Sequence, residues 1–123
     1  MMMKWLEKLI GGNKAAQMAD EVRNLTPEEV SRGLASGKIM IVDVREPREI
    51  EAERIAGSVY LPMSMFDADG IPDPQGKTVV FSCASGIRSV TASQLAQAAG
   101  LPYDAHLAGG LKAWKAAGLP VEQ

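Results

Sequence analysis

The most informative part of the sequence is KTVVFSCASGIRS, residues 77–89. It opens with a short apolar run rich in β-branched residues, which is typical of a strand buried on both faces of a parallel sheet. A loop that holds Cys83 and Gly86 follows, and helical spacing of apolar residues continues from Val90 to Ala99. A buried strand that runs through a short loop into a helix predicts an α/β fold.

The rest of the chain continues the alternation of strands and helices on both sides of this stretch. Thr26, Pro27 and Glu29 form the capping-box pattern of a helix start, and that helix is expected to end near Gly33 or Gly37. The remaining elements are expected as strands at residues 39–44, 58–62 and 104–107, helices at residues 47–54 and 111–117, and a turn-rich loop at residues 66–76. The sequence therefore predicts a mostly parallel central sheet flanked by helices.

The length of 123 residues and the hydrophobic content of 46% suit one compact domain. We expect residues 23–123 to form this domain and residues 1–22 to form an N-terminal helical appendage. Apolar residues recur at helical spacing between Trp5 and Ile10, and glycines follow them. We expect this short helix to pack on the domain. A contact with a membrane or a partner is the alternative, although so short a helix does not bind a membrane firmly by itself.

The overall composition excludes several classes of protein. The net charge is −2, and basic residues are interspersed with acidic ones, so no basic face for nucleic acid is expected. No apolar run approaches the ~18 residues of a membrane span, and the first residues lack the features of a signal peptide. One cysteine rules out an internal disulfide, and no metal site is expected with one cysteine and one histidine. We therefore expect a cytoplasmic protein that uses no metal.

The single cysteine lies where a parallel α/β protein binds its ligands, at the end of a strand and the start of a helix. Backbone N–H groups at a helix start stabilise an anion, and Gly86 allows the loop amides to curl around one centre. Arg88 adds a cation, and Ser89 is expected to cap the helix. These features favour the thiolate form of Cys83. A buried, inert cysteine is the alternative, and it would suit a thiol in the middle of a strand or helix better.

At these residues the sequence resembles the rhodanese family of sulfurtransferases, from about Leu25 to Val121. Four segments carry the resemblance in order: VDVREP at 42–47, RIAGS at 54–58, the loop at 83–89, and GGLKAW at 109–114. The resemblance implies that Cys83 attacks a sulfane sulfur, for example of thiosulfate, and holds it as a persulfide until cyanide or a thiol removes it. It implies no cofactor. The cradle for the donor and the persulfide would be formed by Ala84, Ser85, Gly86, Ile87, Arg88 and Ser89.

The length of the loop separates two chemistries. Phosphatases of the tyrosine-specific kind place an arginine after a cysteine and five further residues. Here Arg88 follows Cys83 after four residues, and Ser89 occupies the position of the phosphatase arginine. The loop should therefore be too small for a phosphate ester and large enough for a sulfur atom, with Arg88 steering anionic donors toward it.

Three other polar residues could have either a functional or a structural role. Asp43 and Arg45 flank the end of a core strand and could support the loop, but we expect a structural ion pair rather than chemistry. His106 is expected to be an incidental, partly exposed histidine on a different strand end. Trp114, Leu111 and Leu107 are expected in the core. The alternative to an enzyme is a rhodanese-like module that delivers sulfur to a protein partner through its N-terminal helix.

Overall fold

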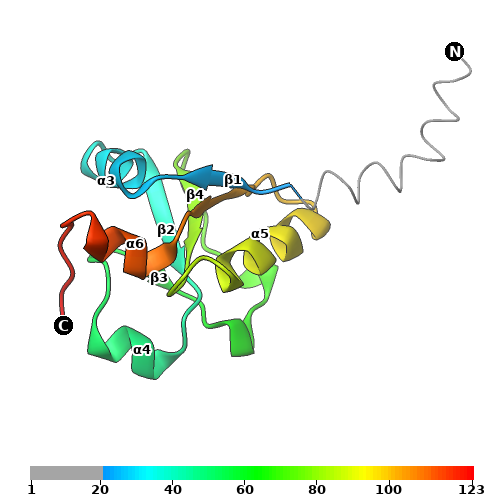
Figure 1. The fold of residues 1–123 in the computed structure, drawn as a ribbon. Helices are drawn as coiled ribbons and strands as arrows, with labels where there is room; N and C mark the ends of the chain where they lie inside the picture. The colour runs from blue at the N-terminus through cyan, green and yellow to red at the C-terminus, as the bar shows by residue number, and fades with distance from the viewer. Residues whose placement is uncertain (1–20) are drawn as a thin grey trace, which may run out of the picture.

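The computed structural model describes residues 21–123, so the helix expected between Trp5 and Ile10 lies outside the described residues. The described chain forms a five-stranded parallel sheet in the order β1-β5-β4-β2-β3 (Figure 1). The strands are β1 Arg23–Leu25, β2 Ile39–Asp43, β3 Val59–Tyr60, β4 Thr78–Ser82 and β5 Ala105–Leu107. The helices are α3 Pro27–Ala35, α4 Pro47–Ala52, α5 Arg88–Ala98 and α6 Gly110–Ala116, with 3₁₀ turns at Met63–Met65 and Ala68–Gly70.

The core lies on both faces of the sheet because successive side chains of a strand point to opposite faces. On one face, Val80 of β4 packs with Val30 of α3 and Trp114 of α6. On the other face, Phe81 of β4 packs with Ala92 of α5. The central strands β2 and β4 are therefore apolar without alternation, as the sequence predicts for a doubly covered parallel sheet.

The parallel α/β fold predicted from the sequence is confirmed, with Leu107, Leu111 and Trp114 buried in the core. The strand β1 was not predicted. It has three residues, two of them exposed, and it pairs only with β5 among the described strands, so it lacks the apolar run of an interior strand. No helix of the described residues is long and apolar enough to cross a membrane.

The register of the sheet brings several candidate site residues to one edge. Asp43 of β2 pairs with Ser82 of β4, and Phe81 of β4 pairs with His106 of β5. The carboxyl ends of these three strands therefore lie side by side, and the loop that follows β4 emerges between the ends of β2 and β5.

Candidate active site

The loop after β4 wraps around the sulfur of Cys83. The Cys83 side chain is buried, with 1% of its surface exposed. Its Sγ accepts hydrogen bonds from the backbone N–H of Gly86, at 3.2 Å, and from that of Ser89, at 3.3 Å. Gly86 has a φ of +98°, a left-handed conformation that L-residues rarely adopt and that aims its N–H at the sulfur. The predicted curl of loop amides around Cys83 is therefore present in the structure.

These contacts decide the acidity of Cys83. Burial alone would raise the pKa of the thiol, but hydrogen bonds from the Ser89 hydroxyl and from the loop amides outweigh it. The amides that contribute are those of Ser89, Gly86 and Ser85, and the net effect lowers the pKa of Cys83 below its ordinary value. The burial of the Cys83 side chain, taken alone, would suggest an inert cysteine. The amides around the sulfur distinguish Cys83 from that alternative.

Ser89 does not cap α5 as the sequence suggests. The cap position is Ile87, and Ser89 lies in the first turn of the helix, fully buried. Its Oγ lies 3.4 Å from Cys83 Sγ and 2.8 Å from His106 Nδ1. The correction has a physical reason: α5 begins at Arg88, two residues earlier than the apolar spacing indicates, so the Ser89 hydroxyl points inward rather than along the helix axis.

His106 is also placed differently from the expectation. It is buried, with 3% of its surface exposed, rather than partly exposed, and it reaches Cys83 through Ser89. Burial lowers the pKa of His106. Its Nε2 lies 2.6 Å from Asn24 Oδ1 on the neighbouring strand β1. The prediction failed because sequence gives no information on strand order, and β5 turns out to be the neighbour of β4.

Arg88 has a carboxylate partner that the sequence analysis did not identify. Its two terminal nitrogens lie 2.7 and 2.9 Å from the carboxylate oxygens of Glu49 on α4. The hydrogen bonds from Arg88 are the main reason that the pKa of Glu49 falls from 4.5 to about 2. Because Glu49 balances the charge of Arg88, the guanidinium attracts an anionic donor less than an unpaired cation would.

Asp43 and Arg45 form a buried pair behind this edge of the sheet. Arg45 Nη2 lies 2.8 Å from Asp43 Oδ2, and both side chains are about 5% exposed or less. Arg45 also donates to the backbone carbonyls of Glu49 and Glu53, so the pair ties the end of β2 to α4. These are the contacts of a structural ion pair. The Asp43 carboxylate accepts from the backbone N–H of Arg45, and among the described residues no N–H of the loop at 83–89 donates to it.

The N-terminal end of α6 binds the backbone of the loop that holds Cys83. The N–H of Leu111 donates to the carbonyl of Cys83 at 2.8 Å, and that of Lys112 donates to the carbonyl of Ala84 at 3.0 Å. Gly110 permits this approach, because a Cβ there would lie 2.4 Å from the Cys83 carbonyl oxygen. The Gly109-Gly110 pair in the sequence is thus explained by the close contact of α6 with the loop.

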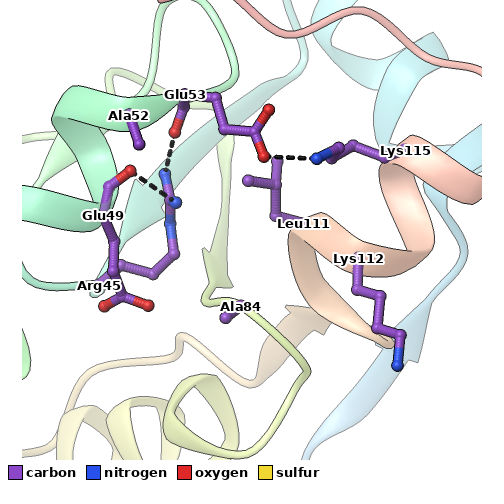
Figure 2. Close-up of a pocket in the computed structure, with 8 residues that line it drawn as sticks. All are labelled: Arg45, Glu49, Ala52, Glu53, Ala84, Leu111, Lys112 and Lys115. Carbon is purple, nitrogen blue, oxygen red and sulfur yellow. Dashed lines mark hydrogen bonds and ion pairs between the residues drawn. The ribbon is translucent and has the colours of Figure 1, made fainter.

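A cleft of about 390 Å³ lies beside the loop, between α4 and α6 (Figure 2). The residues that line it are Arg45, Glu49, Ala52, Glu53, Ala84, Leu111, Lys112 and Lys115. Glu53 and Lys115 form an ion pair across it, whereas Lys112 extends away from that pair (Figure 2). Among the described residues, no carboxylate lies within ion-pair distance of Lys112. The cleft, which Ala84 also lines, therefore offers in Lys112 one cation without a carboxylate partner among the described residues.

Two expected cradle residues point outward. Ser85 is exposed, and 73% of the Ile87 surface is exposed, so the side chains of these two residues do not line the surroundings of Cys83 Sγ. Within residues 21–123, no group of three or more His, Cys, Asp or Glu side chains is arranged to hold a metal ion.

Comparison with known proteins shows the family of this chain. The model of the rhodanese-like domain matches residues 26–117. A sulfurtransferase of Allochromatium vinosum is 33% identical over 101 residues, which cover 81% of this chain and 94% of that protein. The chain belongs to the rhodanese-like domain family.

Two further proteins of less certain function are also similar to this chain. An uncharacterized protein of Synechocystis is 40% identical over 96 residues, which are 78% of this chain, and this chain spans about half of that protein (54%). A solved structure from Rhodopseudomonas palustris has a TM-score of 0.71 and 36% identity, with 89% of each chain covered. It is described as a protein of unknown function and a possible tyrosine phosphatase.

Proposed function

We propose that the protein is a sulfurtransferase in which Cys83 carries the sulfur as a persulfide. The Cys83 thiolate attacks the outer sulfur of a donor such as thiosulfate. A bond forms between the two sulfurs while the sulfur–sulfur bond of thiosulfate breaks, and sulfite leaves with the electron pair. Cyanide or a thiolate then attacks the outer sulfur of the persulfide and restores the Cys83 thiolate. No cofactor enters this scheme.

One observation carries the proposal: the backbone N–H groups of Gly86 and Ser89 both point at Cys83 Sγ at the start of α5. These donors favour the thiolate that attacks, and the same N-terminal turn favours the anionic persulfide that results. We propose that the cradle for the donor and the persulfide consists of these two N–H groups together with the backbone of Ala84, Ser85, Ile87 and Arg88, the other residues between Cys83 and Ser89.

The cleft between α4 and α6 supports an anionic donor. It reaches the loop at Ala84, and Lys112 offers a cation that no described carboxylate neutralises. A cation near the mouth of a site raises the local concentration of anions such as thiosulfate. A single free thiol also needs a reducing compartment to stay reactive, so we place the reaction in the cytoplasm.

A protein acceptor is the second form of this proposal. The side chain of Ile87 is 73% exposed beside the loop, and such an apolar residue next to a persulfide suits contact with the surface of another protein. In that case the chain delivers sulfur to a partner and small acceptors react slowly. Cyanide and protein thiols both require the persulfide of Cys83.

Phosphate ester hydrolysis is a candidate because of the description of the Rhodopseudomonas palustris structure. The loop argues against it, since only four residues separate Cys83 from Arg88, and both terminal nitrogens of Arg88 bind the carboxylate of Glu49. We therefore expect negligible turnover of p-nitrophenyl phosphate.

The test is formation of thiocyanate from thiosulfate and cyanide by the protein and by its Cys83→Ala variant. We expect measurable activity in the native chain and a loss of at least about a thousand-fold in the variant, because no other residue can carry the sulfur. Ser93→Ala is the matched control, because Ser93 is a buried serine of α5 that bonds the Tyr103 carbonyl and does not contact Cys83. An active Cys83→Ala variant would overturn the mechanism, and rapid phosphatase activity would favour the other candidate.

A further inference from the structure

A chain of hydrogen bonds connects the sulfur of Cys83 with the surface of the protein. Cys83 Sγ lies 3.4 Å from Ser89 Oγ, Ser89 Oγ lies 2.8 Å from His106 Nδ1, and His106 Nε2 lies 2.6 Å from Asn24 Oδ1. The first three side chains are almost completely buried, whereas Asn24 on β1 is exposed. The chain runs from the loop through α5 and β5 to the edge strand, and none of its four residues lines the cleft between α4 and α6.

The direction of these hydrogen bonds depends on the protonation of His106. Asn24 Oδ1 can only accept, so Nε2 of His106 carries a proton. A neutral imidazole has no second proton, so its Nδ1 accepts the hydrogen bond from the Ser89 hydroxyl. Ser89 Oγ can then only accept from Cys83, which requires the thiol form. Neutral His106 therefore fits protonated Cys83.

The thiolate requires the opposite direction. A thiolate at Cys83 only accepts, so the Ser89 hydroxyl must turn toward it and donate. Ser89 Oγ is then left with lone pairs facing Nδ1 of His106, which is satisfied when Nδ1 donates. With Nε2 still donating to Asn24, the imidazole carries both protons and is a cation. The thiolate therefore fits His106 in its imidazolium form, which the negative charge of the thiolate must stabilise against the burial that lowers the pKa of His106.

We propose that His106 accepts the proton of Cys83 through the hydroxyl of Ser89 and so acts as a positioning residue for the thiolate. The proton on Cys83 Sγ moves to Ser89 Oγ while the proton of the Ser89 hydroxyl moves to His106 Nδ1. The products are a thiolate and an imidazolium, no group is oxidised or reduced, and no co-reactant is needed. The purpose of the step rests on the proposed function, since the thiolate is the form that attacks sulfur.

The other charged groups near His106 in the described chain are paired with one another and are not hydrogen-bonded to the imidazole. On β1, Arg23 pairs with Asp104, which precedes β5, at 3.0 Å. On α5, Arg88 pairs with Glu49. On β4, the register partner of His106 is the uncharged Phe81. Among the described residues, Cys83 is thus the ionisable group that the hydrogen-bond chain joins to His106.

The first test follows the imidazole nitrogens of His106 by ¹⁵N NMR, which is unambiguous because the chain has one histidine. We expect Nδ1 to be protonated in the native protein at the pH where Cys83 is a thiolate. In Cys83→Ala the Ser89 hydroxyl keeps donating to Nδ1, so the pKa of His106 should fall by about one unit or more. The same titration of His106 in both proteins would overturn the proposal.

The second test measures the rate at which iodoacetamide alkylates the single cysteine as a function of pH. His106→Phe keeps a ring of similar size and removes the imidazolium, so the midpoint should rise by about one pH unit or more. If His106 only restrained the Ser89 hydroxyl, the freed hydroxyl would donate to Cys83 and the midpoint would stay or fall. An unchanged or lower midpoint in His106→Phe therefore contradicts the proposal. Ser93→Ala is the control and should match the native protein.

A third variant, Asn24→Asp, lies at an exposed position and does not depend on repacking the core. Its carboxylate would stabilise the imidazolium through Nε2, so we expect the pKa of His106 to rise and the alkylation midpoint to fall. A negative charge that acted only through space would instead move the midpoint upward, and that result would overturn the relay. None of these measurements uses a sulfur donor. A protein without sulfurtransferase activity could therefore still show the coupling, and an active sulfurtransferase could lack it.

Discussion

Cys83 differs from a structural cysteine in the atoms that surround its sulfur. A thiol buried among apolar groups has a raised pKa and is unreactive. Here the Ser89 hydroxyl, together with the N–H groups of Gly86 and Ser89 at 3.2 and 3.3 Å from Sγ, outweighs the effect of burial on the pKa. The Ser89 hydroxyl contributes most to this lowering of the pKa, and the backbone amides, whose positions depend on the loop conformation, add to it.

The substitution Gly86→Ala tests this dependence on loop conformation. An alanine at a φ of +98° is strained, and its Cβ would lie 3.0 Å from the N atom of Gly109. We expect a loss of about 1–2 kcal/mol in the free energy of unfolding and a higher pKa of Cys83, because the amide turns away from the sulfur. Denaturant unfolding and the pH profile of alkylation measure the two effects. An unchanged profile would show that the Gly86 amide does not stabilise the thiolate.

At the scale of elements, two helices hold the loop from different sides. The first N–H groups of α6 bind the carbonyls of Cys83 and Ala84. The α4 helix reaches the start of α5 through the ion pair between Glu49 and Arg88. The first contact positions the backbone of the loop, and the second ties the guanidinium of Arg88 to α4. We expect substitutions in these helices to change activity without touching Cys83.

The contact of α6 is tested by Gly110→Ala. The new Cβ would lie 2.4 Å from the Cys83 carbonyl oxygen, and backbone atoms cannot give way as a flexible side chain can. Gly118→Ala is the matched control, since Gly118 also has a positive φ of 78° but no atom within 4 Å of a Cβ. We expect Gly110→Ala to be less stable than the control by about 1–3 kcal/mol and to lose most activity. Equal effects of the two substitutions would mean that the clash is unimportant.

The ion pair between α4 and α5 predicts a dependence of stability on pH. The pKa of Glu49 falls from 4.5 to about 2 because Arg88 binds its carboxylate, so the pair stabilises the fold above pH 4.5. This contribution should disappear as the pH falls from 4.5 to about 2, where the carboxylate takes up a proton. Both side chains are about one-third exposed, so the contribution should be about 1 kcal/mol or less.

Thermal unfolding of the native protein and Glu49→Gln over this pH range measures the contribution. The native protein should be the more stable above pH 4.5, and the two should converge at about pH 2. A constant difference across the range would show that ionisation of Glu49 does not contribute to stability.

At the scale of the whole molecule, the sequence predicts the parallel α/β fold well because its central strands are strongly patterned. The residues of β2 and β4 are apolar without alternation, and glycines and prolines mark the ends of the helices. The strand β1 was missed because its three residues carry no such pattern. An edge strand of this length forms through its neighbour β5, and pairing between distant segments is not encoded locally.

The candidate site shows the same division between local and distant information. The amides around Cys83 could be predicted because a strand end, a glycine and a helix start adjoin in sequence. The partners Glu49 and His106 could not be predicted, since they reach the loop from α4 and β5. The cap position of Ser89 was wrong because a shift of two residues at the start of α5 turns its hydroxyl inward.

The central claim is that Cys83 carries a sulfur atom between two reactants. It is tested most directly by the intact mass of the protein after incubation with thiosulfate and removal of small molecules. We expect the mass to increase by one sulfur atom on Cys83, and to return to its first value when cyanide is added and thiocyanate forms. Cys83→Ala should show no increase. Thiocyanate production by a protein that never gains sulfur at Cys83 would contradict the account.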